Sequence, residues 1–241
     1  MTLSEKYRPK SFDDVVYQNH VVPSLKLIND KKQMPNLLFV GPPGCGKTTC
    51  AFLLAKNRGH LSEFNASDER GIDVVREKIK HLALSTQEQI IFLDEADNLT
   101  ADAQGALRRI MEGTTNATFI LSVNREHKLI SAIKSRCAIF RFAKIPDDLV
   151  RERVMKILQE EKIEPDGDVS DLKDGLNSLI KNARGDLRYA LNTLDTVVTD
   201  DKKIKASAIK ILEKPKNILN ILQMAIDCLL YTSPSPRDRQ K

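Results

Sequence analysis

The sequence predicts an α/β protein in which a parallel sheet flanked by helices is followed by a smaller helical region. Three observations predict this fold class. Short apolar runs alternate with helical patterns between residues 37 and 142, which is the order of a parallel, helix-covered sheet. The first apolar run leads into a glycine-rich segment and then a helix, over residues 41–56. After Pro146, helical patterns follow one another with no strand between them.

The composition fits an ordinary globular protein. With 241 residues, 41% hydrophobic and 29% charged, the chain can bury a sizeable core in one large domain or two modest ones. No apolar stretch approaches the length of a membrane span, and the N-terminus has no apolar signal region, so we expect an intracellular protein without a membrane partner. The four cysteines show no C-x-x-C spacing, so neither zinc nor a disulfide is inferred. The net charge of +5 permits contact with nucleic acid and equally fits a solvated basic surface.

The glycine-rich segment is a phosphate-loop motif. Residues 41–48, Gly-Pro-Pro-Gly-Cys-Gly-Lys-Thr, fit the pattern G-x-x-x-x-G-K-[ST] between a predicted strand (37–40) and a predicted helix (49–56). Glycines let the backbone N–H groups turn toward phosphate oxygens. Lys47 can reach the β- and γ-phosphates, and the Thr48 hydroxyl can ligate Mg²⁺. A surface turn is the alternative, and the flanking strand and helix favour phosphate binding.

Two carboxylates follow at the end of the predicted strand over residues 90–95. In open parallel sheets, ligands bind at the carboxyl edge, where Asp94 and Glu95 would lie. Asp94 can hold Mg²⁺ through water, and Glu95 can polarise an attacking water molecule. An Asp-Glu pair could simply cap a turn, but its distance from a phosphate loop favours ATP chemistry.

The remaining elements follow from periodicity. Helices are predicted over residues 19–32, 72–84, 100–112 and 128–134, and further strands over 61–64, 117–123 and 138–142. A second, all-α unit is predicted from helices over 147–161, 172–183, 186–198 and 206–212.

Eight short motifs carry a resemblance to a known family. They are Glu5-Lys-Tyr-Arg-Pro9, Gly41-Pro-Pro-Gly-Cys-Gly-Lys-Thr48, Asn65-Ala-Ser-Asp-Glu-Arg-Gly-Ile72, Leu93-Asp-Glu-Ala-Asp97, Ala103-Gln-Gly-Ala-Leu-Arg-Arg109, Ser122-Val-Asn124, Ser135-Arg-Cys137 and Gly185-Asp-Leu-Arg188. Over about residues 4–227, the chain resembles the small subunits of replication factor C, the AAA+ ATPases of the sliding-clamp loader, in their archaeal form.

The resemblance implies an ATP site with Mg²⁺. Lys47, Asp94 and Glu95 match the Walker A and Walker B residues, and Thr48 with Asp94 would hold the metal, partly through water. Asn124 matches sensor 1, and Arg188 matches sensor 2, which contacts the γ-phosphate of its own chain. By position alone, Asn124 could be a turn former and Arg188 part of a surface ion pair. The implied nucleotide contacts are Tyr7, Arg8, Pro9, Val15, Val16, Gly41, Pro42, Pro43, Gly44, Cys45, Gly46, Lys47, Thr48, Thr49, Asn124 and Arg188.

Other implied roles depend on an assembly. Arg136 matches the arginine finger that acts in trans on the nucleotide of a neighbouring subunit, so an isolated chain would lack a complete active site. Arg70, Arg76 and Lys80 would contact DNA phosphates, although a solvated helix face is the alternative. Asn65 could hold Glu95 away from its water until DNA arrives.

The chain departs from the family pattern at several places, including an unusual segment over residues 125–134 in which Lys134 stands where the family often has glutamine. Tyr17 stands where the family usually has glycine, which puts the turn beside the adenine in doubt. Residues 228–241 resemble the translation of a transposon-based sequencing adapter, so we expect disordered read-through there, with a natural Ser/Pro tail as the alternative. The domains expected are a nucleotide-binding domain over 1–145, a lid over 146–214 and the first helix of a truncated collar over 215–227. A truncated collar would assemble poorly.

The function expected from the resemblance is an ATPase subunit that helps load the ring-shaped sliding clamp onto primed DNA. Its expected partners are large and small clamp-loader subunits, the sliding clamp and primer–template DNA. The expected location is the cytoplasm of an archaeal cell, or a nucleus. Two alternatives stay open: a small-molecule P-loop kinase, and a non-hydrolysing scaffold subunit of the same loader. Ser-Arg-Cys and the helical region argue against the first, and Lys47, Asp94, Glu95 and Arg188 argue against the second.

Overall fold

The computed structural model describes residues 1–204, except 57, 59, 69–70, 166–168 and 200. The predicted helix over 206–212, the collar helix over 215–227 and the segment 228–241 lie outside the described residues, as does Arg70. In the described part of the chain, no helix combines the length and the apolar character needed to cross a bilayer.

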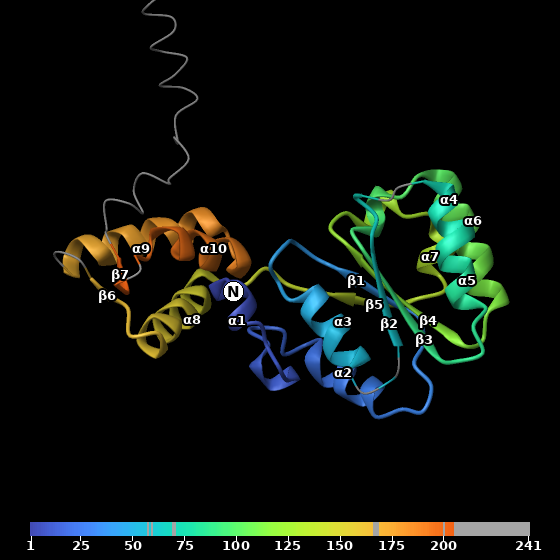
Figure 1. Ribbon diagram of the computed structural model, residues 1–241, viewed down its shortest axis with the longest axis horizontal. Helices are drawn as coiled ribbons and strands as arrows, with labels where there is room; N and C mark the ends of the chain where they lie inside the picture. The colour runs from blue at the N-terminus through green and yellow to red at the C-terminus, as the bar shows by residue number, and fades with distance from the viewer. Residues whose placement is uncertain (57, 59, 69–70, 166–168, 200, 205–241) are drawn as a thin grey trace, which may run out of the picture.

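A five-stranded parallel sheet forms the centre of the larger half of the described molecule (Figure 1). Its strands are β1 (Leu37–Val40), β2 (His60–Asn65), β3 (Gln89–Asp94), β4 (Ala117–Val123) and β5 (Ala138–Arg141). The order is β2-β3-β4-β1-β5, and each pairing is parallel. Because β1 lies between β4 and β5, the phosphate loop leaves the carboxyl edge from an inner strand, with a neighbouring strand on each side. The fold class predicted from the sequence is thus observed.

Helices cover both faces of this sheet, which explains why its inner strands β1, β3 and β4 are mostly apolar and buried, whereas the edge strand β2 is not. The helices are α2 (Val22–Asn29), α3 (Lys47–Ala55), α6 (Ala101–Gly113) and α7 (Ser131–Lys134), with a further helical segment over residues 72–83. Leu37 and Phe39 of β1 pack with α2 and α3, whereas Leu38 packs with the helices of the opposite face. Successive side chains of the strand therefore fill two separate cores.

The segment over residues 72–83 is helical, as predicted, but it is not a uniform α-helix. A π-helical turn, η2 (Val75–Ile79), separates α4 (Ile72–Val74) from α5 (Lys80–Ala83). Val75 and Ile79 are buried against the sheet, and Arg76 and Lys80 are exposed. Such turns are rare and occur often at functional sites.

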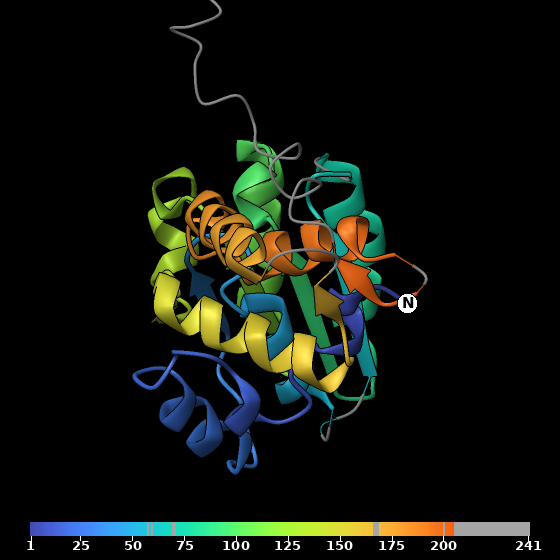
Figure 2. The same cartoon turned by 90° about the vertical axis from the view of Figure 1, so that its left-hand side faces the viewer.

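A second group of helices follows Pro146 and has its own core (Figures 1 and 2). Its helices are α8 (Asp147–Glu160), α9 (Val169–Ala183) and α10 (Leu187–Val197). This unit, called the lid below, also contains a short parallel pair that was not predicted, β6 (Glu164–Pro165) with β7 (Lys203–Ile204). Two-residue strands have no periodicity from which a sequence could predict them.

The N-terminal segment connects the two parts. Helix α1 (Leu3–Lys6) packs on the lid, where Leu3 is buried. After a 3₁₀ turn, η1 (Phe12–Asp14), Val15 is buried with α2 and α3, while the next residue, Val16, packs against the lid core. The adjacent residues Val15 and Val16 thus contact two different cores, that of the sheet with α2 and α3 and that of the lid.

Candidate nucleotide-binding site

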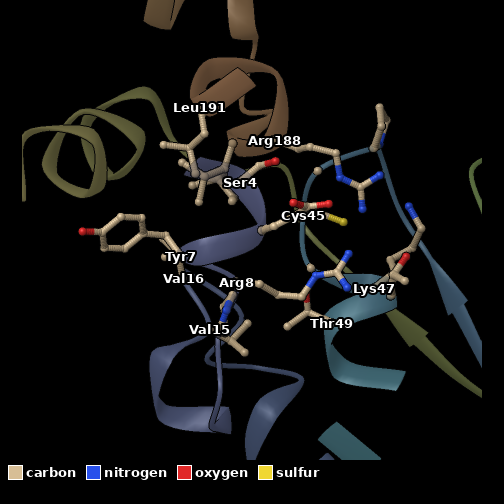
Figure 3. A pocket seen from close by; sticks show the side chains of 18 of the residues that line it. Ser4, Tyr7, Arg8, Val15, Val16, Cys45, Lys47, Thr49, Arg188 and Leu191 are labelled. Carbon is tan, nitrogen blue, oxygen red and sulfur yellow. The ribbon is translucent and has the colours of Figure 1, made fainter. Parts of the chain in front are cut away.

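A pocket at the carboxyl edge of the sheet lies between the phosphate loop, the N-terminal segment and the lid (Figure 3). It brings together most of the residues predicted to bind nucleotide. They are Tyr7, Arg8, Pro9, Val15, Val16, Pro43, Gly44, Cys45, Gly46, Lys47, Thr48, Thr49, Asn124 and Arg188, with Asp94 and Glu95. Gly41 and Pro42 do not line the pocket, although both contact Lys47 through their carbonyl groups.

The backbone of the loop requires glycine. Gly44 and Gly46 have φ angles of +66° and +102°, in the left-handed region. A Cβ atom on Gly44 would lie 1.9 Å from Oδ1 of Asp186, the N-cap residue of α10. The lid therefore sits directly on the phosphate loop, and glycine permits this approach. Cys45 is buried, burial raises the pKa of its thiol, and Sγ lies 2.9 Å from the Pro42 carbonyl.

Lys47 is the first residue of α3 and is almost fully buried. Its Nζ donates to the Gly41 carbonyl at 2.7 Å, to the Pro42 carbonyl at 2.8 Å and to Asn124 Oδ1 at 3.0 Å. Burial lowers the pKa of Lys47 below its ordinary value, and the charge of nearby Asp94 opposes this shift. The ammonium group is thus held at the mouth of the loop by oxygens that a phosphate can replace.

Thr48 and Asp94 form an oxygen pair suited to Mg²⁺. Thr48 Oγ1 donates to Asp94 Oδ2 at 2.9 Å, which joins α3 to the end of β3. A hydroxyl and a carboxylate are hard oxygen donors, and Mg²⁺ in nucleotide sites keeps few protein ligands beside phosphates and water. The residues present therefore fit this metal.

Glu95 has partners other than the predicted one. It adopts a left-handed conformation (φ +51°), and its carboxylate accepts hydrogen bonds from Ser67 Oγ and, at 3.0 Å, from Asn98 Nδ2. Asn65 accepts instead from the Ser67 backbone N–H at 2.9 Å, so it orients the loop that carries Ser67. The loop after β2 thus restrains Glu95, but through Ser67 rather than Asn65.

Asn124 follows β4 and makes hydrogen bonds to both Asp97 and Lys47. Its backbone N–H donates to the buried carboxylate of Asp97 at 3.2 Å, and its Oδ1 accepts from Lys47. Its side-chain oxygen therefore faces the phosphate loop.

The N-terminal segment forms another wall. The Arg8 guanidinium stacks on Phe52 of α3, with 5.3 Å between Cζ and the ring centre. Gln18, which was not predicted, is fully buried and bridges two chain segments. Its Nε2 donates to the Ala143 carbonyl at 2.8 Å and lies 3.4 Å from the Cys45 carbonyl, while its Oε1 accepts from Ala143 N–H at 3.0 Å.

The lid closes the pocket opposite the sheet. Arg188, near the start of α10, points toward the phosphate loop in Figure 3, and Leu191 one turn later is also in the lining. Asp186 accepts from the Tyr189 N–H at 2.9 Å, which fixes the start of the helix and the direction of Arg188.

The other predicted residues lie elsewhere. Arg136 is outside this pocket, in the turn just after α7. Arg76 and Lys80 line a separate groove between the helical segment 72–83 and α6, together with Arg109, which was not predicted. Ser67, Asn98, Gln18 and Asp186 were also missed, because only the fold brings them to the site. Ser67 and Asp186 lie within two of the family motifs, over residues 65–72 and 185–188, and this was the only sequence signal that could have pointed to them.

The fold and the pocket define an ATPase of the AAA class. Residues 37–145 match the ATPase family associated with various cellular activities (AAA). The chain is 42% identical to the replication factor C small subunit of Haloarcula marismortui, over 98% of this chain and 75% of that protein. It is 43% identical to the replication factor C small subunit of Staphylothermus marinus, over 92% of this chain and 70% of that protein. The chain belongs to the replication factor C small-subunit family, the clamp-loader ATPases.

Solved structures show the same fold. Thermotoga maritima RuvB, a Holliday junction branch migration motor, has a TM-score of 0.66 at 20% identity, over 85% of this chain and 71% of that one. A point mutant of the same protein has a TM-score of 0.68 at 19% identity, over 86% of this chain and 72% of that one. The predicted family and fold are thus confirmed, and the roles of single residues stay predictions.

Proposed function

We propose that this chain binds ATP with Mg²⁺ and hydrolyses it as one subunit of a clamp loader assembled from large and small subunits. One observation supports this most: Lys47, the Thr48–Asp94 pair, Glu95, Asn124 and Arg188 converge on one pocket between sheet and lid. The archaeal origin of the relatives supports a place in the cytoplasm of an archaeal cell.

The chemistry is transfer of the γ-phosphoryl group from ATP to water. Glu95 orients the water and takes its proton, the new P–O bond forms, and the bond to the bridging oxygen breaks to release ADP and phosphate. Mg²⁺ held by Thr48 and Asp94 would neutralise charge on the phosphate oxygens. Lys47 and Arg188 hold the γ-phosphate from the loop and from the lid.

The separation of the sheet cores from the lid core supports the domain division at residues 145–146, with one qualification. Ile145 and the helices after it share the lid core, but so does Leu3 from the N-terminus. We therefore propose that the lid turns together with helix α1 when nucleotide binds.

The test of this function is ATP turnover in the assembled loader. Lys47→Ala should abolish nucleotide binding by the altered subunit, and Glu95→Gln should retain binding but lower turnover by a factor on the order of 10² or more. Arg136→Ala should lower turnover by about 10³ at the neighbouring site if it acts in trans. Phosphate release that matches ADP release is expected. A phosphorylated small molecule in place of free phosphate would favour the kinase alternative, and full turnover by Lys47→Ala assemblies would favour the scaffold.

The basic groove supports contact with primer–template DNA. Arg76, Lys80 and Arg109 are exposed on its rim, and the ion pairs found among the described residues involve none of the three. Phosphate contacts of this kind track a duplex without reading its sequence.

DNA affinity measured against salt concentration tests the groove. Replacing Arg76, Lys80 or Arg109 by alanine should weaken binding equally for unrelated sequences and reduce the salt slope by about one per residue. Lys26→Ala, which removes a cation of α2 paired with Asp13, is the control and should change neither quantity. A sequence-dependent loss would argue against phosphate contacts.

A further inference from the structure

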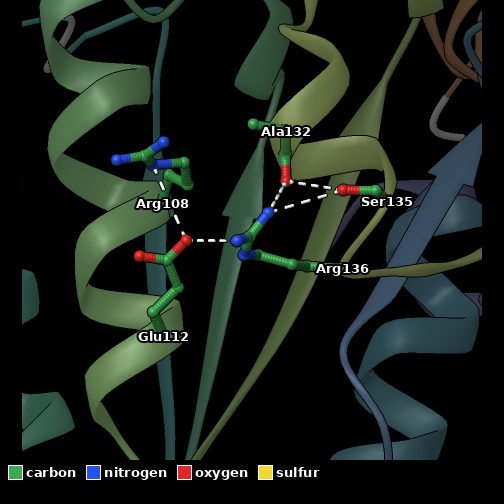
Figure 4. Close-up of polar contacts among 5 residues, drawn as sticks. All are labelled: Arg108, Glu112, Ala132, Ser135 and Arg136. Atoms are coloured by element: carbon green, nitrogen blue, oxygen red, sulfur yellow. Dashed lines mark hydrogen bonds and ion pairs between the residues drawn. The ribbon is translucent and has the colours of Figure 1, made fainter.

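The surroundings of Arg136 are built from two elements of its own chain (Figure 4). Its Nη1 donates to the Ala132 carbonyl at 2.7 Å and lies 3.4 Å from Ser135 Oγ, both in or next to α7. Its Nη2 donates to the carboxylate of Glu112, in the last turn of α6. Arg136 is thus held both by Glu112 of α6 and by residues of α7 and the turn that follows it.

Glu112 also meets a second cation. The Nε of Arg108, one turn earlier on α6, lies 3.8 Å from the same Oε1 atom that Arg136 contacts. One carboxylate oxygen therefore stands between two guanidinium groups. The three side chains are 35–39% exposed, which leaves them accessible to a neighbouring subunit.

We propose that Glu112 is a positioning residue for the trans arginine, fixing the Arg136 guanidinium in the orientation in which it reaches a neighbour's nucleotide. This inference rests on the proposed trans role of Arg136. Glu112 itself does not touch the reacting atoms and acts only through Arg136.

The donor count supports this role. A guanidinium has five N–H groups. The contacts with Ala132, Ser135 and Glu112 use three of them, which leaves the Nε–H and one Nη2–H for phosphate oxygens. An arginine side chain that is ordered only on assembly loses rotamer entropy at that point, and Glu112 removes part of this cost before the subunits meet.

Charge supports it as well. Without the carboxylate, Arg108 and Arg136 would face each other as like charges, and Arg136 would turn away from its present direction. Glutamine at position 112 keeps an acceptor oxygen but loses the charge. Glu112→Gln therefore tests how much the charge of Glu112 contributes to holding Arg136.

The first test uses mixed assemblies in which Lys47→Ala subunits, in excess, bind no nucleotide but still offer Arg136 to their neighbours. Glu112→Gln placed in these donor subunits should lower the neighbours' kcat by about tenfold to a hundredfold at unchanged KM. The same change placed in the active subunits, whose arginines face sites without nucleotide, should leave turnover unchanged. Equal losses in both arrangements would overturn the proposal.

Two variants sharpen the result. Glu112→Asp should recover part of the lost turnover. Glu126→Gln is the matched control, because it removes the charge of another carboxylate that pairs with an arginine. Glu126 lies in the 3₁₀ turn after β4 and accepts from Nη2 of Arg141, the last residue of β5, at 2.9 Å. This change should have no effect on turnover. If Arg136→Ala lowers turnover and Glu112→Gln does not, the positioning role is wrong and the trans role stands. If Arg136→Ala has no effect, the trans role itself is wrong, and the proposal falls with it.

A second measurement needs no assembly. In the isolated chain, p-hydroxyphenylglyoxal should modify Arg136 severalfold faster in Glu112→Gln than in the unaltered chain or in Glu126→Gln, as mapped by mass spectrometry. An unchanged rate would show that Glu112 does not restrain Arg136.

Discussion

Tyr17 occupies a backbone conformation that favours glycine. Its φ angle is +63°, and the residue as a whole is 41% exposed, so its packing is incomplete. The family resemblance places glycine at this position, and the structure gives the physical reason. The turn keeps the shape that glycine would give it, and Gln18, the next residue, still reaches Ala143.

Tyr17→Gly should therefore stabilise the chain. Relief of left-handed strain is worth about 1–2 kcal/mol, and the greater freedom of glycine in the unfolded chain returns about half of it. We expect the free energy of unfolding, measured with urea, to rise by about 0.5–1 kcal/mol. Tyr17→Ala is the control, because it removes the ring and keeps the strain. An equal gain with alanine would show that the ring, not the backbone, is the cause.

Ser67 gives a prediction about regulation. Its hydroxyl and the Asn98 amide hold the Glu95 carboxylate, so Ser67→Ala should free Glu95 to orient water without DNA. Loss of one hydrogen bond of about 1 kcal/mol corresponds to an increase of about fivefold in DNA-independent ATP turnover. Ser85→Ala, in a remote loop, serves as the control. Lower turnover in Ser67→Ala would show that Ser67 holds Glu95 in a productive position instead.

The site was predictable where its residues are neighbours in sequence. Lys47 with Thr48, and Asp94 with Glu95, lie at strand ends next to recognisable loops, so local pattern and chemistry suffice. Gln18 meets residues 27 and 125 positions away, and Asp186 meets the phosphate loop from another core. Contacts at such separation depend on packing, which no local pattern contains.

Among the elements, α1 is attached to the end of α8 by a polar cluster. Tyr7 Oη donates to Glu161 Oε1 at 2.8 Å, and Lys6 pairs with the same carboxylate. Hydrogen bonds from Lys6 and from Tyr7 lower the pKa of Glu161. Burial raises the pKa of Tyr7 to about 12, and the hydrogen bond to Glu161 adds to this shift. The cluster couples one wall of the nucleotide pocket to the lid.

The sign of these shifts predicts a pH dependence. Because the pKa of Glu161 is lower in the folded state, its contribution is present above its ordinary value of 4.5 and is lost as pH falls through the folded pKa. Tyr7 behaves in the opposite way, since its contribution is present below pH 10 and is lost as pH rises toward its folded pKa of about 12.

Glu161→Gln should cost about 1 kcal/mol of unfolding free energy at pH 7, a value reduced by solvent around the half-exposed Lys6. The difference from the unaltered chain should shrink below pH 4.5, as followed by urea unfolding between about pH 3.5 and 7. A difference that does not change with pH would mean that the charge of Glu161 contributes nothing.

Element type was predictable from periodicity, but details were not. The strands predicted over 37–40 and 117–123 have the observed bounds, because apolar runs between turn residues mark both ends. The π-helical turn at Val75–Ile79 keeps both apolar residues buried, so its hydrophobic pattern resembles that of an α-helix. The β6–β7 pair is too short to have a pattern.

At the scale of the whole molecule, the pocket lies where the sheet cores and the lid core meet. A ligand there contacts both parts, so it should stabilise the chain as a unit. At about 100 times its Kd, ATP with Mg²⁺ adds about 2.7 kcal/mol, which raises the Tm by about 5–10 °C for a chain of this size.

Differential scanning fluorimetry checks this expectation. Lys47→Ala should remove the shift in Tm, and Lys26→Ala should retain it. A full shift in the Lys47→Ala chain would place the nucleotide outside the phosphate loop. Two separate transitions, of which only one responds to ATP, would show that the ligand contacts one part alone.

Gln18 joins Ala143, just before the lid, to Cys45 of the phosphate loop through the three contacts of one side chain. If the lid turns as proposed, the Ala143 peptide moves with it, and the Gln18 amide would pass part of that movement to the Cys45 backbone. Under the proposed function, a movement of the lid would thus reach the phosphate loop by a route that does not involve Arg188. The proposed function thus has two routes from the lid to the nucleotide, one through the charge of Arg188 and one through the neutral amide of Gln18.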